Sequence, residues 1–273
     1  MADVKQFCIA TPIVWAGAGP VTQFAGDMDR LISSVNEIAR NCGEAFELTG
    51  AFLDVHSTEK DKLCSFRNVI YRASVRKPSE RTGKGMGHWW YTCVDEAINR
   101  APSVNAVLYY PVDVCWDDSA ENTVVNAFRL CGMLKHLSAT SEEVLLLGNY
   151  ASTNARKELI EEHVLHLLRE AYPMLKEADM EEVTRVRTEF WAITPGLFRT
   201  FKSACLENGD FPVVPDPTLL LLIYCLEAKA RVDTYDLGMY RAEGDYDNEK
   251  VRKQIERAKK IVSDFKGRFL QRT

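Results

Sequence analysis

Two acids and a glycine-lysine turn are spaced along the sequence in a way that could bind a nucleoside diphosphate. Asp54 ends an apolar run that starts at residue 46, and Asp113 ends a second apolar run over 105–113. Many nucleotide-using α/β enzymes present an acid at a sheet edge in this way. Between the two acids lies the segment 82–87, Thr-Gly-Lys-Gly-Met-Gly, which leads into a helical pattern. Backbone amides of such a turn can hold phosphate oxygens, so the three features together predict a nucleotide diphosphate site.

The turn itself has two interpretations. Gly83, Lys84 and Gly85 match neither the spacing of a P-loop nor the glycine order of a dinucleotide-binding fold. Taken alone, the segment is typical of a surface turn. Its position between the two acids favours a role in binding phosphate.

Apolar periodicity predicts the elements that must position these residues. The order strand, helix, strand, helix, strand in the first half indicates a Rossmann-like half sheet with right-handed crossovers, and the second half alternates less regularly. We therefore expect an α/β fold in which helices flank a mixed sheet. The expected strands are 7–12, 46–54, 69–75, 105–113, 144–148, 186–193 and 231–237, and the expected helices are 23–43, 90–98, 121–137, 154–172, 195–206, one capped by Asp216 with Pro217 at its first position, and one from residue 248.

Composition limits the class of protein. The 273 residues contain no long flexible linker, so we expect a single domain over 1–273 that divides into halves at about residue 118. A net charge of −5 argues against nucleic acid as a partner, because neutralising phosphates needs an excess of lysine and arginine. The longest apolar run, 219–226, is too short to span a bilayer, and the eight scattered cysteines indicate reduced thiols. We expect a soluble cytoplasmic protein, and both a monomer and a homodimer are compatible with the sequence.

Motifs at the strand ends, taken in order, resemble those of the GT-A glycosyltransferases, the nucleotide-diphosphosugar transferases. The first strand ends in Ile-Ala-Thr-Pro at 9–12 and the second leads into Asp-Val-His-Ser-Thr at 54–58. The Gly-Lys-Gly turn follows, before the strand that ends at Asp113. The resemblance implies a GT-A fold in which residues 1–118 bind a nucleoside diphosphate sugar.

The same resemblance implies a role for each residue of that site. Two residues flank the base, one acid accepts a hydrogen bond from its ring N–H, the glycine-lysine turn meets the diphosphate, and the second acid reaches the metal or the ribose. The base is flanked by Thr11 and Pro12, and the acid that accepts from its ring N–H is Asp54. The turn at the diphosphate contains Gly83 and Lys84, and the second acid is Asp113. Catalysis would then depend on Lys84 and Asp113.

Motifs in the second half look like those of the retaining glucosyl-3-phosphoglycerate and mannosylglycerate-type synthases. They are Gly-Asn-Tyr at 148–150, Asn-Ala-Arg-Lys-Glu-Leu at 154–159, Thr-Glu-Phe at 188–190 and Asp-Leu-Gly at 236–238. The likeness implies that 119–273 holds a small, anionic acceptor such as glycerate or phosphoglycerate. The implied acceptor residues are Asn149, Arg156, Glu189 and Asp216.

Arg156 also has an interpretation from the residues alone. It lies in the first turn of a predicted helix, where a cation opposes the helix dipole and is favoured only beside an anionic partner. The alternative is an ordinary exposed basic residue.

A divalent cation, Mg²⁺ or Mn²⁺, is implied by the resemblance, and the sequence departs from the usual ligands. The family motif often holds two acids, whereas Asp113 stands alone with Asp117 and Asp118 beyond it. The position that often holds a metal-binding histidine falls at or next to Ala242 and Glu243. Hard cations accept carboxylate oxygen, so the expected metal ligands are Asp113 and Glu243.

These features predict a glycosyltransferase that moves a hexose from a nucleoside diphosphate sugar to a small acceptor with retention of configuration. Two alternatives are a nucleotidylyltransferase that acts on sugar phosphates and a protein that binds sugar nucleotides without catalysis. The first would place its phosphate loop just after the first strand, where 15–20 contains no lysine or arginine. The second is suggested by the missing second acid.

Overall fold

The computed structural model describes residues 4–13, 21–54, 69–73, 86–109, 120–152, 155–173, 190–241 and 247–270. Predicted elements that fall wholly or partly on other residues lie outside this description, including the end of the strand expected to reach Asp113 and the start of the strand expected at 186–193. Strands are β1 (Lys5–Ile13), β2 (Phe46–Asp54), β3 (Val69–Ala73), β4 (Val104–Tyr109), β5 (Val144–Ser152), β6 (Trp191–Ile193) and β7 (Arg231–Arg241). Helices are α1 (Val21–Asn41), α3 (Met86–Arg100), α4 (Ala120–Ala139), α5 (Ala155–Ala171), α7 (Pro195–Cys205), α8 (Pro217–Glu227) and α9 (Asn248–Phe265).

The described strands form one mixed sheet in the order β3-β2-β1-β4-β6-β5-β7. Parallel pairing joins β3, β2, β1 and β4, whereas β6 is antiparallel to both of its neighbours, β4 and β5. β7 pairs with β5 in parallel. All strands other than β6 therefore run in one direction, and their carboxyl ends meet at a single edge of the sheet, called the carboxyl edge below. The opposite side is the amino edge.

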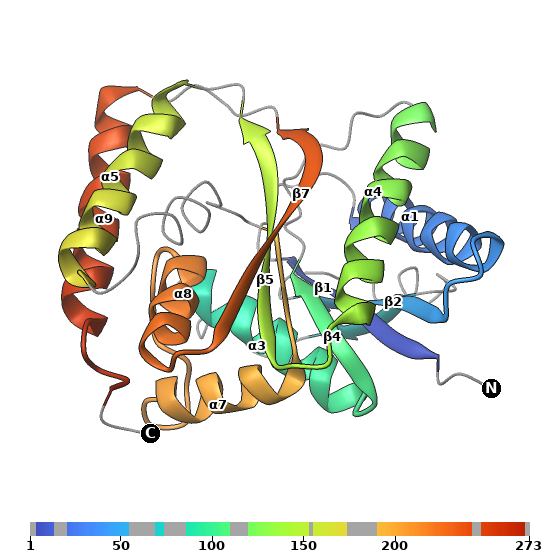
Figure 1. Ribbon diagram of the computed structural model, residues 1–273, viewed down its shortest axis with the longest axis horizontal. Coiled ribbons are helices and arrows are strands. Elements are labelled where there is room, and N and C mark those ends of the chain that lie inside the picture. The colour runs from blue at the N-terminus through green and yellow to red at the C-terminus, as the bar shows by residue number, and fades with distance from the viewer. Residues whose placement is uncertain are drawn as a thin grey trace.

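Helices cover both faces of the sheet, as Figure 1 shows. α1 and α4 pack on one face, and α3, α5, α7, α8 and α9 lie on the other. Successive residues of a strand point to opposite faces, so Cys8 and Ala10 contact the larger layer while Phe7 and Ile9 contact α1 and α4. Burial on both faces explains why the strands read as continuous apolar runs rather than as an alternating pattern.

α8 is the most completely buried helix of the larger layer. Every residue from Pro217 to Cys225 is buried, because α3 and α9 pack against it. The apolar run at 219–226 is thus a core helix. Among the described residues, no helix is both long enough and apolar enough to cross a membrane.

A buried carboxylate attaches the C-terminal segment to α8. Glu227, which is 5% exposed, accepts hydrogen bonds from Gly267 N at 2.6 Å and from Phe269 N at 2.8 Å. The Tyr172 hydroxyl donates to the same carboxylate at 2.6 Å. Burial and this hydrogen bond raise the pKa of Tyr172, so the hydroxyl keeps its proton and remains a donor. One side chain therefore ties α5, α8 and the segment after α9 together.

We predict that Glu227→Ala destabilises the protein by about 2–4 kcal/mol, because two backbone N–H groups and a hydroxyl lose their acceptor inside the protein. Urea denaturation followed by circular dichroism measures the free energy of unfolding. The matched control is Glu256→Ala, which removes an exposed carboxylate paired with Lys259 and should change stability by less than about 0.5 kcal/mol. A loss below about 1 kcal/mol for Glu227→Ala would contradict this role.

Candidate functional site

The strand order reverses between β1 and β4, which is where ligands bind in open α/β sheets. From β1 the chain passes through α1 on one face to β2 and β3, and then returns through α3 on the other face to β4. β2 and β4 are the two neighbours of β1, and the helices that lead into them, α1 and α3, therefore lie on opposite faces of the sheet. In open α/β sheets such a reversal forms the ligand-binding crevice at the carboxyl edge, so the ends of β1 and β4 mark the expected place of the site.

Thr11 lies on β1 next to this crevice and carries an unsatisfied polar atom. The side chain is buried to 1% exposure, and its Oγ1 has no hydrogen-bond partner among the described residues. A buried hydroxyl without a partner costs about 1–3 kcal/mol, and such groups in folded proteins usually have a functional explanation or a bound partner. Thr11 was expected at the base of a nucleotide, and that role stays a prediction.

The backbone brings further predicted residues to the same place. Cα partners pair Pro12 with Leu53 and Ile13 with Asp54, so Pro12 and Asp54 lie on neighbouring strands at the carboxyl edge. β4 ends at Tyr109, opposite Ala10, and runs toward the segment that holds Asp113. Gly83, Lys84 and Asp113 are outside the described residues, and their roles stay predictions.

Two of the acceptor residues predicted in the second half, Asn149 and Arg156, lie toward this edge. Asn149 is in the carboxyl-terminal half of β5 and pairs with Asp236 in the middle of β7. Arg156 lies in the first turn of α5, which begins shortly after β5 ends. Glu189 and Glu243 belong to segments that the structure leaves undescribed. The expected acceptor and nucleotide residues therefore approach one edge from both halves of the sheet.

Irregular pairing between β5 and β7 marks the carboxyl edge and was missed in the sequence. The register shifts between Asn149 and Tyr150, so that Tyr150 pairs with Met239. Such irregularities are frequent beside active sites, where they redirect side chains. Just before the shift, Gly148 approaches its neighbours so closely that a Cβ there would lie 2.7 Å from Leu237 Cδ1 and 3.2 Å from Phe190 Cβ. The position accepts only glycine without local rearrangement.

Asp216 has a structural role as well as its predicted one. Its carboxylate accepts a hydrogen bond from Leu219 N at 3.0 Å and caps α8, as its place before Pro217 predicted. The Tyr91 hydroxyl donates to the Pro217 carbonyl nearby. The Tyr91 hydrogen bond, rather than the cap, joins the start of α8 to α3.

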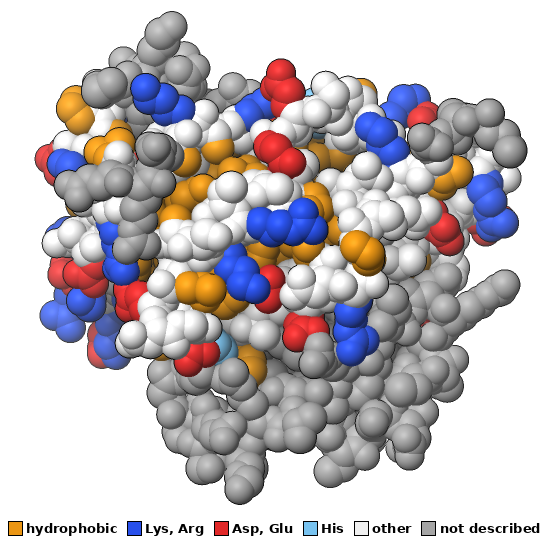
Figure 2. All heavy atoms as spheres, turned by 90° about the horizontal axis from the view of Figure 1, so that it is seen from below, with side chains coloured by type: hydrophobic (Ala, Val, Ile, Leu, Met, Phe, Trp, Pro, Cys, Tyr) orange, Lys and Arg blue, Asp and Glu red, His pale blue; other side chains and the backbone are white. Residues whose placement is uncertain are grey.

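The amino edge contains a cavity of about 420 Å³, which Figure 2 views from below. Acidic, basic and apolar side chains alternate across this face rather than forming a field of one sign (Figure 2). Lys5 donates to the Ser138 carbonyl, and Glu143 accepts from Leu197 N at 2.8 Å at the start of α7. Lys5 and Glu143 therefore form hydrogen bonds within the protein.

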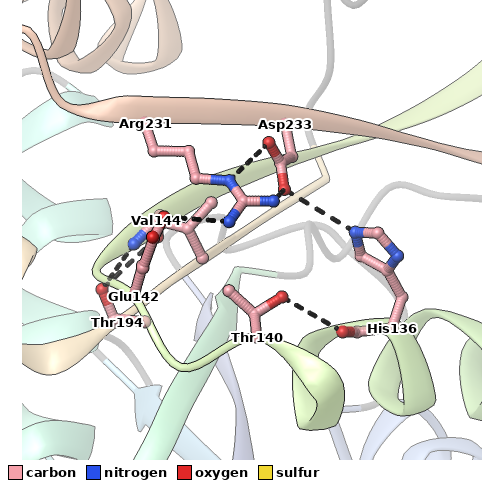
Figure 3. Close-up of polar contacts among 7 residues, drawn as sticks. All are labelled: His136, Thr140, Glu142, Val144, Thr194, Arg231 and Asp233. Carbon is pink, nitrogen blue, oxygen red and sulfur yellow. Dashed lines mark hydrogen bonds and ion pairs between the residues drawn. The ribbon is translucent and has the colours of Figure 1, made fainter.

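A network beside this cavity joins the starts of β5 and β7 (Figure 3). Arg231 donates to Asp233 at 2.9 Å and to Glu142 at 3.0 Å, and His136 on α4 lies 3.7 Å from Asp233. Thr194 Oγ1 meanwhile accepts from Val144 N at 3.0 Å. The amino edge thus fixes the strand register, and the candidate site lies at the opposite edge.

Burial disfavours a nucleophilic role for two of the described cysteines. Burial raises the pKa of Cys8 to about 12, and burial also raises the pKa of Cys225. Both thiols therefore stay protonated at neutral pH. The described cysteines are free, and Cys42 alone among them is exposed, in line with the expected reduced thiols.

No group of three or more His, Cys, Asp or Glu side chains that could hold a metal ion occurs within the described ranges. Both expected ligands, Asp113 and Glu243, fall outside those ranges. The metal site stays a prediction.

Comparison with known proteins identifies the fold. No family model matches the sequence, and no curated protein matches it at a significant level. A crystal structure described as that of a mycobacterial protein aligns with a TM-score of 0.58 at 12% identity, covering 96% of this chain and 75% of that one. Mannosyl-3-phosphoglycerate synthase from Rubrobacter xylanophilus aligns with a TM-score of 0.58 at 13% identity, covering 96% and 73% respectively. The expected GT-A-like α/β fold is confirmed.

We predict that the cap and the acceptor role of Asp216 can be separated. Asp216→Ala should lower stability by about 1 kcal/mol, because Leu219 N loses its acceptor. Asp216→Asn should keep the stability, since asparagine caps helices equally well. Thermal unfolding measures both effects. If Asp216→Asn unfolds as readily as Asp216→Ala, the carboxylate stabilises the protein through its charge rather than through the cap.

Proposed function

We propose that the protein is a glycosyltransferase that takes a hexose from a nucleoside diphosphate sugar. The observation that carries this proposal is the buried hydroxyl of Thr11, which has no partner among the described residues and lies on β1, at the reversal point of a GT-A-like sheet. A bound nucleotide would supply the missing hydrogen-bond partner. The fold shared with mannosyl-3-phosphoglycerate synthase supports the same class of reaction.

The nucleotide half would bind the donor. Thr11 and Pro12 flank the base, and the Asp54 carboxylate accepts a hydrogen bond from its ring N–H. The glycine turn at Gly83 and Lys84 holds the diphosphate through backbone amides and an ammonium group. Asp54 and Pro12 support this arrangement, because the sheet register brings them to the same crevice as Thr11.

Mg²⁺ or Mn²⁺ is the cation that the carboxylates of Asp113 and Glu243 would hold. When bound, such an ion neutralises charge on the diphosphate leaving group. Asp113 follows β4 closely in the chain, and Glu243 follows β7. Both strands end at the carboxyl edge, which supports a shared site.

The acceptor would be a small anion, such as glycerate or phosphoglycerate, bound by Asn149, Arg156, Glu189 and Asp216. The N-terminus of α5 supports an anionic acceptor, because its free N–H groups and dipole favour negative charge. The fold shared with mannosyl-3-phosphoglycerate synthase supports phosphoglycerate in particular. α5 begins at Ala155, directly before Arg156.

The reaction would proceed on one face of the sugar with retention of configuration. The bond between the anomeric carbon and the phosphate oxygen breaks, and the acceptor oxygen forms the new bond to that carbon. The proton of the acceptor hydroxyl passes to the departing phosphate. No protein nucleophile is needed, and the residues contribute mainly by orienting the reactants and stabilising the leaving group.

An assay with purified protein tests the proposal directly. The protein is incubated with a panel of nucleoside diphosphate hexoses, with glycerate or 3-phosphoglycerate, and with Mg²⁺ or Mn²⁺. Released nucleoside diphosphate and the mass of the glycoside are measured. Formation of pyrophosphate from a nucleoside triphosphate and a sugar phosphate would instead indicate a nucleotidylyltransferase. Binding of a nucleotide sugar by thermal shift without any turnover would indicate a non-catalytic binding protein.

Thr11→Val is the matched variant for this experiment. Valine keeps the shape of the side chain and removes the buried hydroxyl, so the free protein should be as stable as the wild type or more so. Affinity for the donor nucleotide should fall by about 5–50-fold, measured by calorimetry, because the ligand loses one hydrogen bond. Equal affinity with improved stability would remove Thr11 from the site.

Arg156→Ala should raise the KM for the acceptor about tenfold or more and leave the KM for the donor within about twofold, since only the acceptor loses a charged contact. Initial rates at varied concentrations of each substrate measure both constants. Lys157→Ala is the control for loss of a positive charge in the same turn of α5. Equal changes in the two KM values would contradict the assignment of Arg156 to the acceptor.

A further inference from the structure

Trp191 occupies the junction between the two halves of the sheet. It is the first residue of β6, and its Cα partners are Tyr109 on β4 and Leu147 on β5. β4 belongs to the parallel half that begins the chain, and β5 leads into α5. Because β6 runs antiparallel to both neighbours, its first residue lies at the carboxyl edge. Trp191 therefore lies where a donor bound by one half and an acceptor bound by the other must meet.

A stack of aromatic rings holds the indole of Trp191 in place. Its ring lies 5.2 Å from the Tyr109 ring with an interplanar angle of 19°, and the Tyr109 ring lies 4.3 Å from the Trp90 ring at 26°. Trp191 is 0% exposed, Tyr109 is 2% exposed and Trp90 is 7% exposed. Stacked rings on β6, β4 and α3 leave the indole little freedom to turn. The direction of its N–H bond is therefore determined by the packing.

That N–H group has no partner. Nε1 of Trp191 is buried and makes no hydrogen bond within the described part of the chain. An indole nitrogen can only donate, and buried tryptophan N–H groups usually find an acceptor. Leaving one unpaired is unfavourable, and such exceptions call for a functional explanation or a bound partner. Thr11 Oγ1, on β1, likewise has no partner among the described residues.

We propose that the Trp191 indole N–H donates a hydrogen bond to an anionic oxygen, phosphate or carboxylate, of a ligand bound at the junction of the two halves. The inference rests on the proposed function and adds a binding residue to it. An anionic acceptor suits the position because charge-assisted hydrogen bonds are stronger and best offset the desolvation of a buried donor. The N-terminus of α5, which follows β5 at the same edge, favours negative charge there as well.

Two ligands carry such oxygens, the diphosphate of the donor and the acid group of the acceptor. Nuclear magnetic resonance of protein labelled with ¹⁵N-tryptophan distinguishes them, because each of the five tryptophans gives one indole N–H signal. Trp191→Phe identifies the signal of Trp191, and through-bond assignment does so if that variant does not fold. Uridine or guanosine diphosphate is titrated in one arm, and glycerate or 3-phosphoglycerate in the other. A neutral methyl hexoside serves as a third arm.

We expect a saturable downfield shift of the Trp191 indole proton in one of the two anionic arms, and that arm identifies the source of the oxygen. Affinity for the same ligand should fall about tenfold in Trp191→Phe and less than twofold in Trp90→Phe, which changes the other indole of the stack. The two variants should unfold at similar temperatures, because both keep an aromatic ring in the stack. No shift with any anion, a shift with the hexoside alone, or unchanged affinity in Trp191→Phe would overturn the inference.

The outcome is separable from that of the proposed function. Hexose transfer by the wild-type protein without any shift of the Trp191 signal would leave the function in place and remove Trp191 from the site. A shift with an anion in a protein that transfers no sugar would keep Trp191 as a binding residue and reject the transferase.

Discussion

The structure depends on one short strand that runs against all the others. β6 contributes only Trp191, Ala192 and Ile193 to the described sheet, and all three are completely buried. It pairs with β4 on one side and β5 on the other, so the two halves of the chain share a single hydrogen-bonded sheet. β4 and β5 run in the same direction, α4 crosses between them on one face, and β6 fills the space between the two strands. The carboxyl ends of both halves are thereby brought to one edge.

This arrangement divides the molecule into an edge that is internally satisfied and an edge that is not. At the amino edge, Arg231 pairs with both Glu142 and Asp233, and Glu143 accepts from Leu197 N at the start of α7. At the carboxyl edge, Thr11 and Trp191 keep buried polar atoms without partners among the described residues. Proteins often concentrate such unfavourable features at functional sites and compensate for them elsewhere. The position of the two unsatisfied atoms thus agrees with the position of the reversal in strand order.

Much of the fold follows from local patterns in the sequence, and most of the candidate site does not. Apolar runs predicted the strands because helices cover both faces of the sheet, and the Asp216-Pro217 pair predicted the start of α8. β7 extends past the expected end to Arg241, because β5 continues beside it as far as Ser152. The direction of β6 and the register shift at Asn149 are tertiary features, since they depend on which strands become neighbours. Nothing in the sequence indicated that Trp191 would stack on Tyr109 with an indole N–H that has no partner among the described residues.

The aromatic stack at the junction indicates what kind of catalyst this fold can support. Burial keeps the Cys8 thiol protonated at neutral pH, so the sheet does not provide a thiolate there. Trp90, Tyr109 and Trp191 instead form a rigid buried stack built from one helix and two strands, with little side-chain freedom left to lose. In a displacement that needs no protein nucleophile, the rate depends on how closely the donor and the acceptor are held in reacting geometry. A stack that spans both halves of the sheet is suited to this task, because it fixes the position of one ligand relative to the other.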